Sequence, residues 1–276
     1  MQRKSELMYI LIILCGAMIM LSCDREDDNM NFMDDDMDMS GVIDTMVMDT
    51  TGVTMDTMVV DTTVVDTTGM SMDSLMNKTI TYLALGDSYT IGQGVSTDMN
   101  FPNQLSDSIV GYSGDTVSVD IIARTGWTTG NLLDAIHTQD PVPHDVVSLL
   151  IGVNNQFQNQ SYFVFQDEFN ELLDISINLA GGAENVFVVS IPDYGVTPFG
   201  SSNSANIAEA LDNYNAYMKG QCDTLEIPFI DVTSISRVLG DTDGALATDD
   251  LHPSGLQYSL WVQEMIPVVL PIFEAQ

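Results

Sequence analysis

Three residues from two distant parts of the sequence have the types and contexts that acyl-transfer chemistry uses. An exposed Ser88 is expected at the end of the apolar run YLALGDS, and Asp249 precedes His252 by three residues in DDLHPSG. A serine hydroxyl is a poor nucleophile until an adjacent histidine accepts its proton. A carboxylate on the second ring nitrogen then fixes the histidine tautomer and stabilises the imidazolium. Ser88, His252 and Asp249 are therefore candidates for a catalytic triad.

Two further residues are candidates for stabilising the oxyanion that forms when a serine attacks a carbonyl. Gly126 lies in ARTGWTTG and Asn154 lies in GVNNQ, and each follows a predicted strand. With the backbone N–H of Ser88, the N–H of Gly126 and the side-chain amide of Asn154 would supply three donors. Losing one such donor typically costs about 10²–10³-fold in kcat. Taken singly, each of these residues is equally typical of an ordinary turn or helix cap.

The elements that must position these residues are strands alternating with helices from residue 79 onward. Predicted strands cover 79–85, 116–123, 145–151, 185–191 and 227–232, and predicted helices cover 101–110, 128–139, 162–180, 203–224 and a segment starting near residue 253. This alternation predicts parallel strands joined by right-handed crossovers. We expect a three-layer α/β/α sandwich of the flavodoxin-like type with about five parallel strands, whose carboxyl ends carry the functional residues.

The serine, glycine, asparagine and histidine, in this order and context, resemble the four marks of the SGNH/GDSL hydrolase family. The resemblance covers residues 79 to 270 and includes IPDYG at 191–195. It implies that Ser88 is the nucleophile, His252 the base and Asp249 its orienting carboxylate. It also implies an oxyanion hole made by Ser88, Gly126 and Asn154, with no cofactor and no metal.

One position departs from the pattern of that family. Its third block usually reads Gly-x-Asn-Asp, whereas this chain has Asn155 in place of the aspartate. Because the aspartate is expected to support the loop, we expect looser oxyanion geometry here. Trp127, next to Gly126, is predicted either to wall the acyl pocket or to pack in the core.

The resemblance implies a serine esterase that hydrolyses carboxylic esters through an acyl-serine intermediate. Acyl or acetyl groups on glycans, lysophospholipids and small esters all remain candidate substrates. One alternative is a non-catalytic carbohydrate-binding or adhesion lipoprotein on the same fold, because a fold does not secure a function. A second alternative is an acyltransferase, which uses the same chemistry and excludes water.

The charge of the chain excludes one class of partner. The sequence has 276 residues, with 40 Asp and Glu against 7 Lys and Arg, for a formal net charge of −33. A polyanion repels nucleic acid, so nucleic-acid binding is set aside. The same charge disfavours anionic substrates.

Residues 1–22 have the sequence features of a lipoprotein signal peptide, with a basic start, a short apolar stretch and small residues at its end. The ending MLSC resembles a bacterial lipobox, which implies lipidation of Cys23 and anchoring to a membrane. The acidic DREDDN that follows Cys23 resembles the surface-export signal of Bacteroidota lipoproteins. We therefore expect an exported lipoprotein at the outer membrane or cell surface of a Gram-negative bacterium. The alternative is an uncleaved N-terminal anchor helix.

Residues 23–78 are predicted to be a disordered acidic tether rich in Asp, Thr and Met, preceding a hydrolase domain at 79–276. Its repeated triplets, such as DTM and DTT, resemble the O-glycosylation sites of Bacteroidota. An unmodified charged linker is the alternative, and calcium binding by DDDMDM ranks below both. In the predicted domain, Cys222 is expected to be a small side chain packed in or near a helix.

Overall fold

The computed structural model describes residues 78–276, in which five strands form one parallel sheet. The strands are β1 (Thr79–Gly86), β2 (Thr116–Ala123), β3 (Val146–Leu150), β4 (Val186–Val189) and β5 (Phe229–Ile230). Their order is β2-β1-β3-β4-β5, and every neighbouring pair is parallel. This is the flavodoxin-like order, in which the chain reverses direction across the sheet between β1 and β3.

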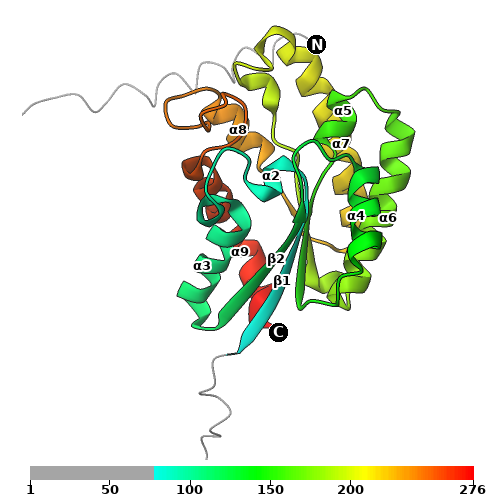
Figure 1. Ribbon diagram of the computed structural model, residues 1–276, viewed down its shortest axis with the longest axis vertical. Helices are drawn as coiled ribbons and strands as arrows, with labels where there is room; N and C mark the ends of the chain where they lie inside the picture. Colours follow the sequence, from blue (N-terminus) through cyan, green and yellow to red (C-terminus); the bar gives the residue numbers. More distant parts are fainter. Residues whose placement is uncertain (1–77) are drawn as a thin grey trace, which may run out of the picture. The chain divides into compact units, whose positions relative to one another are not determined.

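Helices cover both faces of the sheet, which confirms the predicted three-layer architecture. The longer helices are α3 (Phe101–Ser113), α4 (Thr129–Gln139), α6 (Tyr162–Ala180), α7 (Ser204–Leu225) and α9 (Gly255–Glu274). Figure 1 shows α3 and α9 on one face and α4, α6 and α7 on the other. The shorter elements are α2 (Ser88–Ile91), α5 (Val153–Phe157), α8 (Thr233–Leu239), η2 (Thr97–Met99), η3 (Ala183–Asn185), η4 (Tyr194–Val196) and η5 (Ser201–Asn203).

Several element boundaries differ from the sequence-based expectation, and two of these differences have a clear physical reason. The strand expected at 227–232 is reduced to Phe229–Ile230, because the chain turns directly into α8 and the Asp231 carboxylate accepts the Ser234 N–H at 3.1 Å. The helix expected to start near residue 253 begins at Gly255, where Ser254 caps it, and continues through two prolines to Glu274. Its buried face, which includes Trp261, holds it against the sheet despite the two missing backbone donors.

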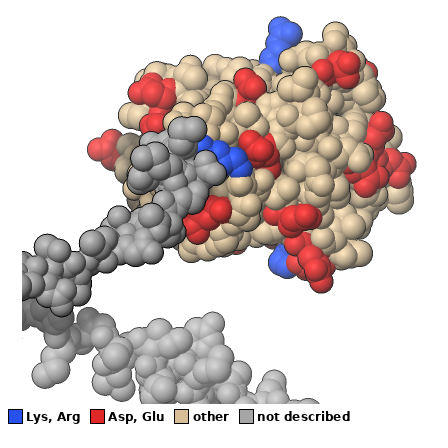
Figure 2. Space-filling view, turned by 90° about the horizontal axis from the view of Figure 1, so that it is seen from below, with Lys and Arg blue, Asp and Glu red and all other residues tan. Residues whose placement is uncertain are grey.

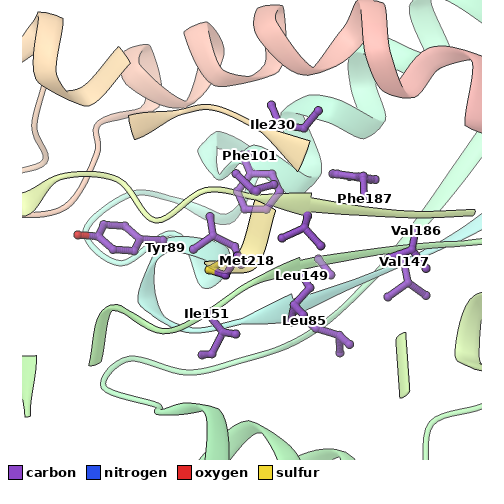
Figure 3. Close-up of a cluster of buried hydrophobic side chains, with 14 of the residues drawn as sticks. Leu85, Tyr89, Phe101, Val147, Leu149, Ile151, Val186, Phe187, Met218 and Ile230 are labelled. Atoms are coloured by element: carbon purple, nitrogen blue, oxygen red, sulfur yellow. The ribbon is translucent and has the colours of Figure 1, made fainter. Parts of the chain in front are cut away.

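The core lies on both faces of the central strands. All residues of β3 and β4 are buried, as expected for parallel strands covered by helices on both sides, whereas the edge strand β2 is only partly buried. Figure 3 shows side chains from β1, β3 and β4 packed together with Phe101 and Met218 from the helices. The resulting rigid sheet provides fixed strand ends on which a site can be built.

Cys222 is fully buried in α7, which confirms the expected packing role. Burial raises the pKa of its thiol to about 12. Within residues 78–276, no helix is both long and apolar enough to cross a bilayer. The predicted signal peptide, Cys23 and the tether repeats all lie outside the described residues.

Candidate active site

Ser88 lies directly beyond the carboxyl end of β1, where a sharp turn leads into α2. The turn requires Gly86, since a Cβ there would lie 2.1 Å from Thr90 Oγ1 and 2.4 Å from the Leu150 carbonyl oxygen. Asp87 caps α2, and its Oδ1 accepts the Tyr89 N–H at 3.0 Å. Ser88 is only 4 % exposed, so the expectation of an exposed serine is wrong. It lines a cavity together with His252.

His252 and Asp249 form a hydrogen-bonded pair on the loop that precedes α9. His252 Nδ1 lies 2.7 Å from Asp249 Oδ2, and the other carboxylate oxygen accepts the backbone N–H groups of Leu251 and His252. An antiparallel bridge between Leu246 and Pro253 braces the loop. Among the hydrogen bonds of the described residues, none joins the neighbouring Asp250 to the ring.

The environment of Asp249 keeps it ionised. Partial burial by itself would raise the pKa of the carboxyl, but the hydrogen bonds from His252 and Leu251 outweigh that effect and lower the pKa below its usual value. An ionised Asp249 favours the tautomer in which Nδ1 carries the proton. The neutral ring then has Nε2 free to act as a base.

Gly126 and Asn154 lie beyond the ends of β2 and β3 and line the same cavity as Ser88 and His252. Gly126 adopts a φ of +84°, and no atom would lie within 4 Å of a Cβ added there, so its backbone is open to a ligand. Asn154 Nδ2 donates to the Trp127 carbonyl at 2.9 Å. An amide nitrogen has two hydrogens, so this bond fixes the side chain and leaves one donor.

Two side chains at and just beyond α5 hold the loop that contains Gly126. Asn154 contacts the Trp127 carbonyl, and Gln158 Nε2 donates to the Gly126 carbonyl at 3.1 Å. Trp127 itself packs half-buried against the core and does not line the cavity, which decides between the two expected roles.

Asn155 holds the first turn of α4, directly after that loop. Its Oδ1 accepts the Thr129 N–H at 3.0 Å, and its Nδ2 donates to Thr129 Oγ1 at 2.6 Å. The Thr129 hydroxyl in turn donates to Glu168 Oε2 on α6. Asn155 is fully buried, and its hydrogen bonds support the turn that follows the loop. The looser oxyanion geometry expected from the missing aspartate stays a prediction.

The cavity has a volume of about 230 Å³ and brings together side chains from several strand ends. Its lining residues are Ser88, Tyr89, Thr125, Gly126, Val153, Asn154, Phe157, Tyr194, Phe199, Leu251 and His252. Among the hydrogen bonds of the described residues, none joins Ser88 Oγ to the His252 ring. Hydrogen bonds of this kind are often long in ligand-free sites and tighten when substrate binds.

The other two histidines lie elsewhere. His137 is exposed on α4, although Asp134 precedes it by the same three residues. His144 is buried before β3, where its ring contacts Asp120 Oδ2 at 2.9 Å and the Val142 carbonyl at 2.8 Å. Within residues 78–276, no cluster of three or more His, Cys, Asp and Glu side chains is arranged to hold a metal ion.

Comparison with known proteins decides the family. The sequence model of the GDSL-like Lipase/Acylhydrolase family matches residues 84–260. The chain belongs to this family. Membership makes this GDSL hydrolase an enzyme that acts on carboxylic esters. The matched range includes every residue that lines the cavity.

Solved structures show the same fold at low sequence identity. The lipase Lip_vut3 from a goat rumen metagenome has a TM-score of 0.55 and 18 % identity, covering 68 % of this chain and 96 % of its own. The lipase/acylhydrolase from Enterococcus faecalis has a TM-score of 0.52 and 22 % identity, covering 70 % of this chain and 96 % of its own. The family 3 carbohydrate esterase of Clostridium thermocellum has 0.52 and 20 %, covering 72 % and 98 %. None of the curated proteins matches the chain.

Sequence reasoning missed several residues of the site. Thr129, Gln158 and Glu168 hold the loop, and Phe157 and Phe199 line the cavity. Phe157 had a usable signal, since it follows Asn154 by three residues and so shares its helix face. Glu168 had none, because only the packing of α6 against α4 brings it to Thr129.

Proposed function

We propose that this GDSL hydrolase is a serine esterase for neutral carboxylic esters, with Ser88 as nucleophile. The observation that carries the proposal is a single cavity lined by Ser88, Gly126, Asn154 and His252, with Asp249 hydrogen-bonded behind the histidine. Each of the five residues has a role in acyl transfer that its position supports.

In the first half-reaction, Ser88 Oγ attacks the ester carbonyl carbon as His252 Nε2 removes the hydroxyl proton. A C–O bond forms to the serine, and the carbonyl π electrons move to the oxygen. The tetrahedral intermediate collapses, the bond to the alcohol breaks, and His252 returns the proton to the departing alkoxide. Asp249 stabilises the imidazolium that exists between these two transfers.

The oxyanion is stabilised by donors that are already in place. The backbone N–H groups of Ser88 and Gly126 and the free amide hydrogen of Asn154 are the proposed set. Their fixed positions matter because donors that need no reorganisation stabilise the developing charge most effectively. The bonds from Asn154 and Gln158 to the Gly126 loop supply that rigidity.

In the second half-reaction, water replaces the alcohol. His252 removes a proton from water, the hydroxide oxygen bonds to the acyl carbon, and the Ser88 C–O bond breaks with the proton returned to Oγ. The products are a carboxylic acid and the regenerated enzyme. An acyltransferase would differ only in the nucleophile of this step, so product analysis with a sugar acceptor present separates the two activities.

Serine substitution tests the proposal. Ser88→Ala should lower kcat for nitrophenyl and alkyl esters by a factor on the order of 10⁶, as loss of the nucleophile does in other serine hydrolases. Asn154→Ala should lower kcat by about 10²–10³-fold. Ser96→Ala is a matched control, because Ser96 is exposed and its side chain makes no cap hydrogen bond.

Covalent labelling of the serine provides a result that could contradict the proposal. A fluorophosphonate should label wild-type protein at Ser88 and leave the Ser88→Ala variant unlabelled. Folded wild-type protein that takes no label and hydrolyses none of the esters would contradict the esterase and favour a binding protein on this fold.

We also propose that the enzyme is exported and membrane-anchored through a lipid on Cys23. Support comes from the sequence of residues 1–29, with its basic start, apolar stretch, MLSC ending and acidic DREDDN. The ester substrates would then be met outside the cytoplasm, on soluble molecules or on glycans.

A further inference from the structure

Three aromatic side chains line one side of the cavity and contact each other. Phe157 comes from α5, Tyr194 from η4 and Phe199 from the segment between η4 and η5. Their ring centroids are separated by 6.2 Å for Phe157 and Tyr194, 5.8 Å for Phe157 and Phe199, and 6.3 Å for Tyr194 and Phe199. We call these three residues the aromatic wall.

The outer part of the aromatic wall remains exposed. Phe157 is 51 % exposed and Phe199 is 53 % exposed, although both rings belong to the lining of the cavity. When an apolar group of a ligand covers apolar surface that was exposed to water, the complex is stabilised. Their exposure therefore favours a ligand that completes the burial.

The aromatic wall is held in position before any ligand binds. Tyr194 is buried, and its hydroxyl donates to Gln156 Oε1 at 2.8 Å. Phe157 meets the Tyr194 ring edge to face, with an interplanar angle of 81°. A pre-organised aromatic surface loses little conformational entropy on binding, which increases its contribution to affinity.

The same cavity offers no cationic side chain to an anionic group of the substrate. No Lys or Arg is among its lining residues, and the carboxylate of Asp249 lies behind His252. A phosphate or carboxylate on the substrate would meet no opposite charge there. The chemistry of the cavity thus fits an uncharged ester with an apolar chain or ring.

We propose that the aromatic wall binds an apolar group attached to the scissile ester, and that this sets the substrate preference. Neutral esters with an apolar chain of several carbons, on the acyl or the alcohol side, are preferred over a bare acetyl group on a polar sugar. This inference rests on the proposed function, since it assumes that the ester reacts at Ser88.

Two ester series measured by pH-stat test this preference. One series keeps ethanol and lengthens the acyl group from acetate to hexanoate, and the other keeps acetate and lengthens the alcohol from ethanol to hexanol. In the series whose varied group contacts the aromatic wall, kcat/KM should rise by about threefold to fourfold per methylene. The series with the steeper rise in kcat/KM shows whether the acyl group or the alcohol contacts the aromatic wall.

Removal of the exposed rings should flatten that dependence. In the Phe157→Ala/Phe199→Ala double variant, the ratio of kcat/KM for the longest to the shortest ester should fall from on the order of 10² to below about 10. Phe157→Leu/Phe199→Leu keeps apolar volume and should keep an intermediate slope. Phe163→Ala is the matched control, since Phe163 is 76 % exposed on α6 and does not line the cavity.

Either of two results would overturn the inference. One is a wild-type enzyme whose kcat/KM does not increase with chain length in either series. The other is a double variant, folded by circular dichroism, that keeps the wild-type slope. If Ser88→Ala still abolishes turnover in those cases, the proposed function stands without this preference, whereas turnover that survives Ser88→Ala removes the proposed function itself.

Discussion

Asp87, the residue before Ser88, is the most unusual titratable side chain of the site. It is completely buried, and one carboxylate oxygen accepts the Tyr89 N–H. The other oxygen, Oδ2, has no hydrogen-bond partner among the described protein atoms. Burial raises its pKa to about 7, although the hydrogen bond from Tyr89 opposes that shift. A carboxyl that is half-protonated near neutrality thus caps the helix of the nucleophile.

Stability should therefore depend on pH through Asp87. Between about pH 4 and pH 7 the folded state keeps a proton that the unfolded state has released, so the free energy of unfolding falls as pH rises through this window. Asp87→Asn removes the titration. The variant should be more stable relative to wild type at pH 8 than at pH 4, by up to about 4 kcal/mol for a shift of this size.

Urea unfolding of both proteins from pH 4 to pH 8 measures that difference. Asp98→Asn is a suitable control, since Asp98 is exposed on η2. This substitution should change the free energy of unfolding by the same amount at every pH in the range. A difference between wild type and Asp87→Asn that stays constant across the range would contradict the buried titration.

Single residues also show what spacing can and cannot predict. Asp249 and His252 have the spacing that the structure turns into a 2.7 Å contact. Asp134 and His137 have the same spacing, yet they lie on α4, with the His137 ring exposed and no hydrogen bond between them in the part of the chain described. The loop before α9, rather than the spacing, makes the difference, because it lets both carboxylate oxygens face the following residues.

At the scale of elements, α4, α5 and α6 are joined by a hydrogen-bond relay. Asn155 donates to the Thr129 hydroxyl, and Thr129 donates to Glu168. The direction is fixed, because Asn155 Oδ1 already accepts the Thr129 N–H. The chain thus places an acidic group on α6 and an amide where the family usually has an aspartate. The loop with Gly126 lies directly before the anchored turn.

The relay predicts a rescue between two substitutions. In the Asn155→Asp variant, two carboxylates compete for the single proton of the Thr129 hydroxyl, so the loop should shift. The value of kcat should fall about tenfold or more, which is part of the loss expected when one oxyanion donor is removed. Adding Glu168→Gln supplies an amide that donates to Thr129. The double variant should recover to within about threefold of wild-type kcat.

Glu168→Gln alone should have little effect, because its amide oxygen can still accept from Thr129. Lowering the pH should also partly restore the Asn155→Asp variant, since one of its two carboxyls can then take a proton. Asn159→Asp is the matched control on an exposed residue. Additive losses in kcat, without recovery in the double variant, would show that the two side chains do not act through Thr129.

The order of elements was predictable because parallel strands and their helices have distinct periodicities. All five strands and the longer helices lie where the apolar patterns indicate. The errors fall where a local side-chain cap or a tertiary contact overrides the apolar pattern. Asp231 ends β5 early by capping the next turn, and the buried face of α9 carries the helix past Pro267 and Pro271. The aromatic wall was not predicted, since its members come from three separate segments.

At the scale of the whole molecule, the chain carries a large excess of negative charge. Figure 2 shows acidic side chains scattered across one face with few basic ones between them. The formal net charge of the chain is −33, and the cavity is lined by no cation. Such a field lowers the local concentration of anionic ligands.

Salt should therefore discriminate between substrates by their charge. For the monoethyl ester of a dicarboxylic acid, kcat/KM should rise several-fold between about 0.01 and 0.5 M NaCl, as screening shortens the range of repulsion. For an uncharged ethyl ester of similar length it should change far less. Equal salt responses for the two esters, measured at constant pH, would show that the surface charge does not reach the site.

The cavity joins chain segments that are made at very different times. Ser88 follows the first strand of the sheet, whereas His252 precedes α9, and the Tyr258 hydroxyl on α9 donates to the Tyr89 carbonyl across 169 residues of sequence. During synthesis of the chain, the proposed nucleophile is therefore made long before its proposed base. On the proposed mechanism, a chain that ends before residue 252 lacks the base and should not hydrolyse esters.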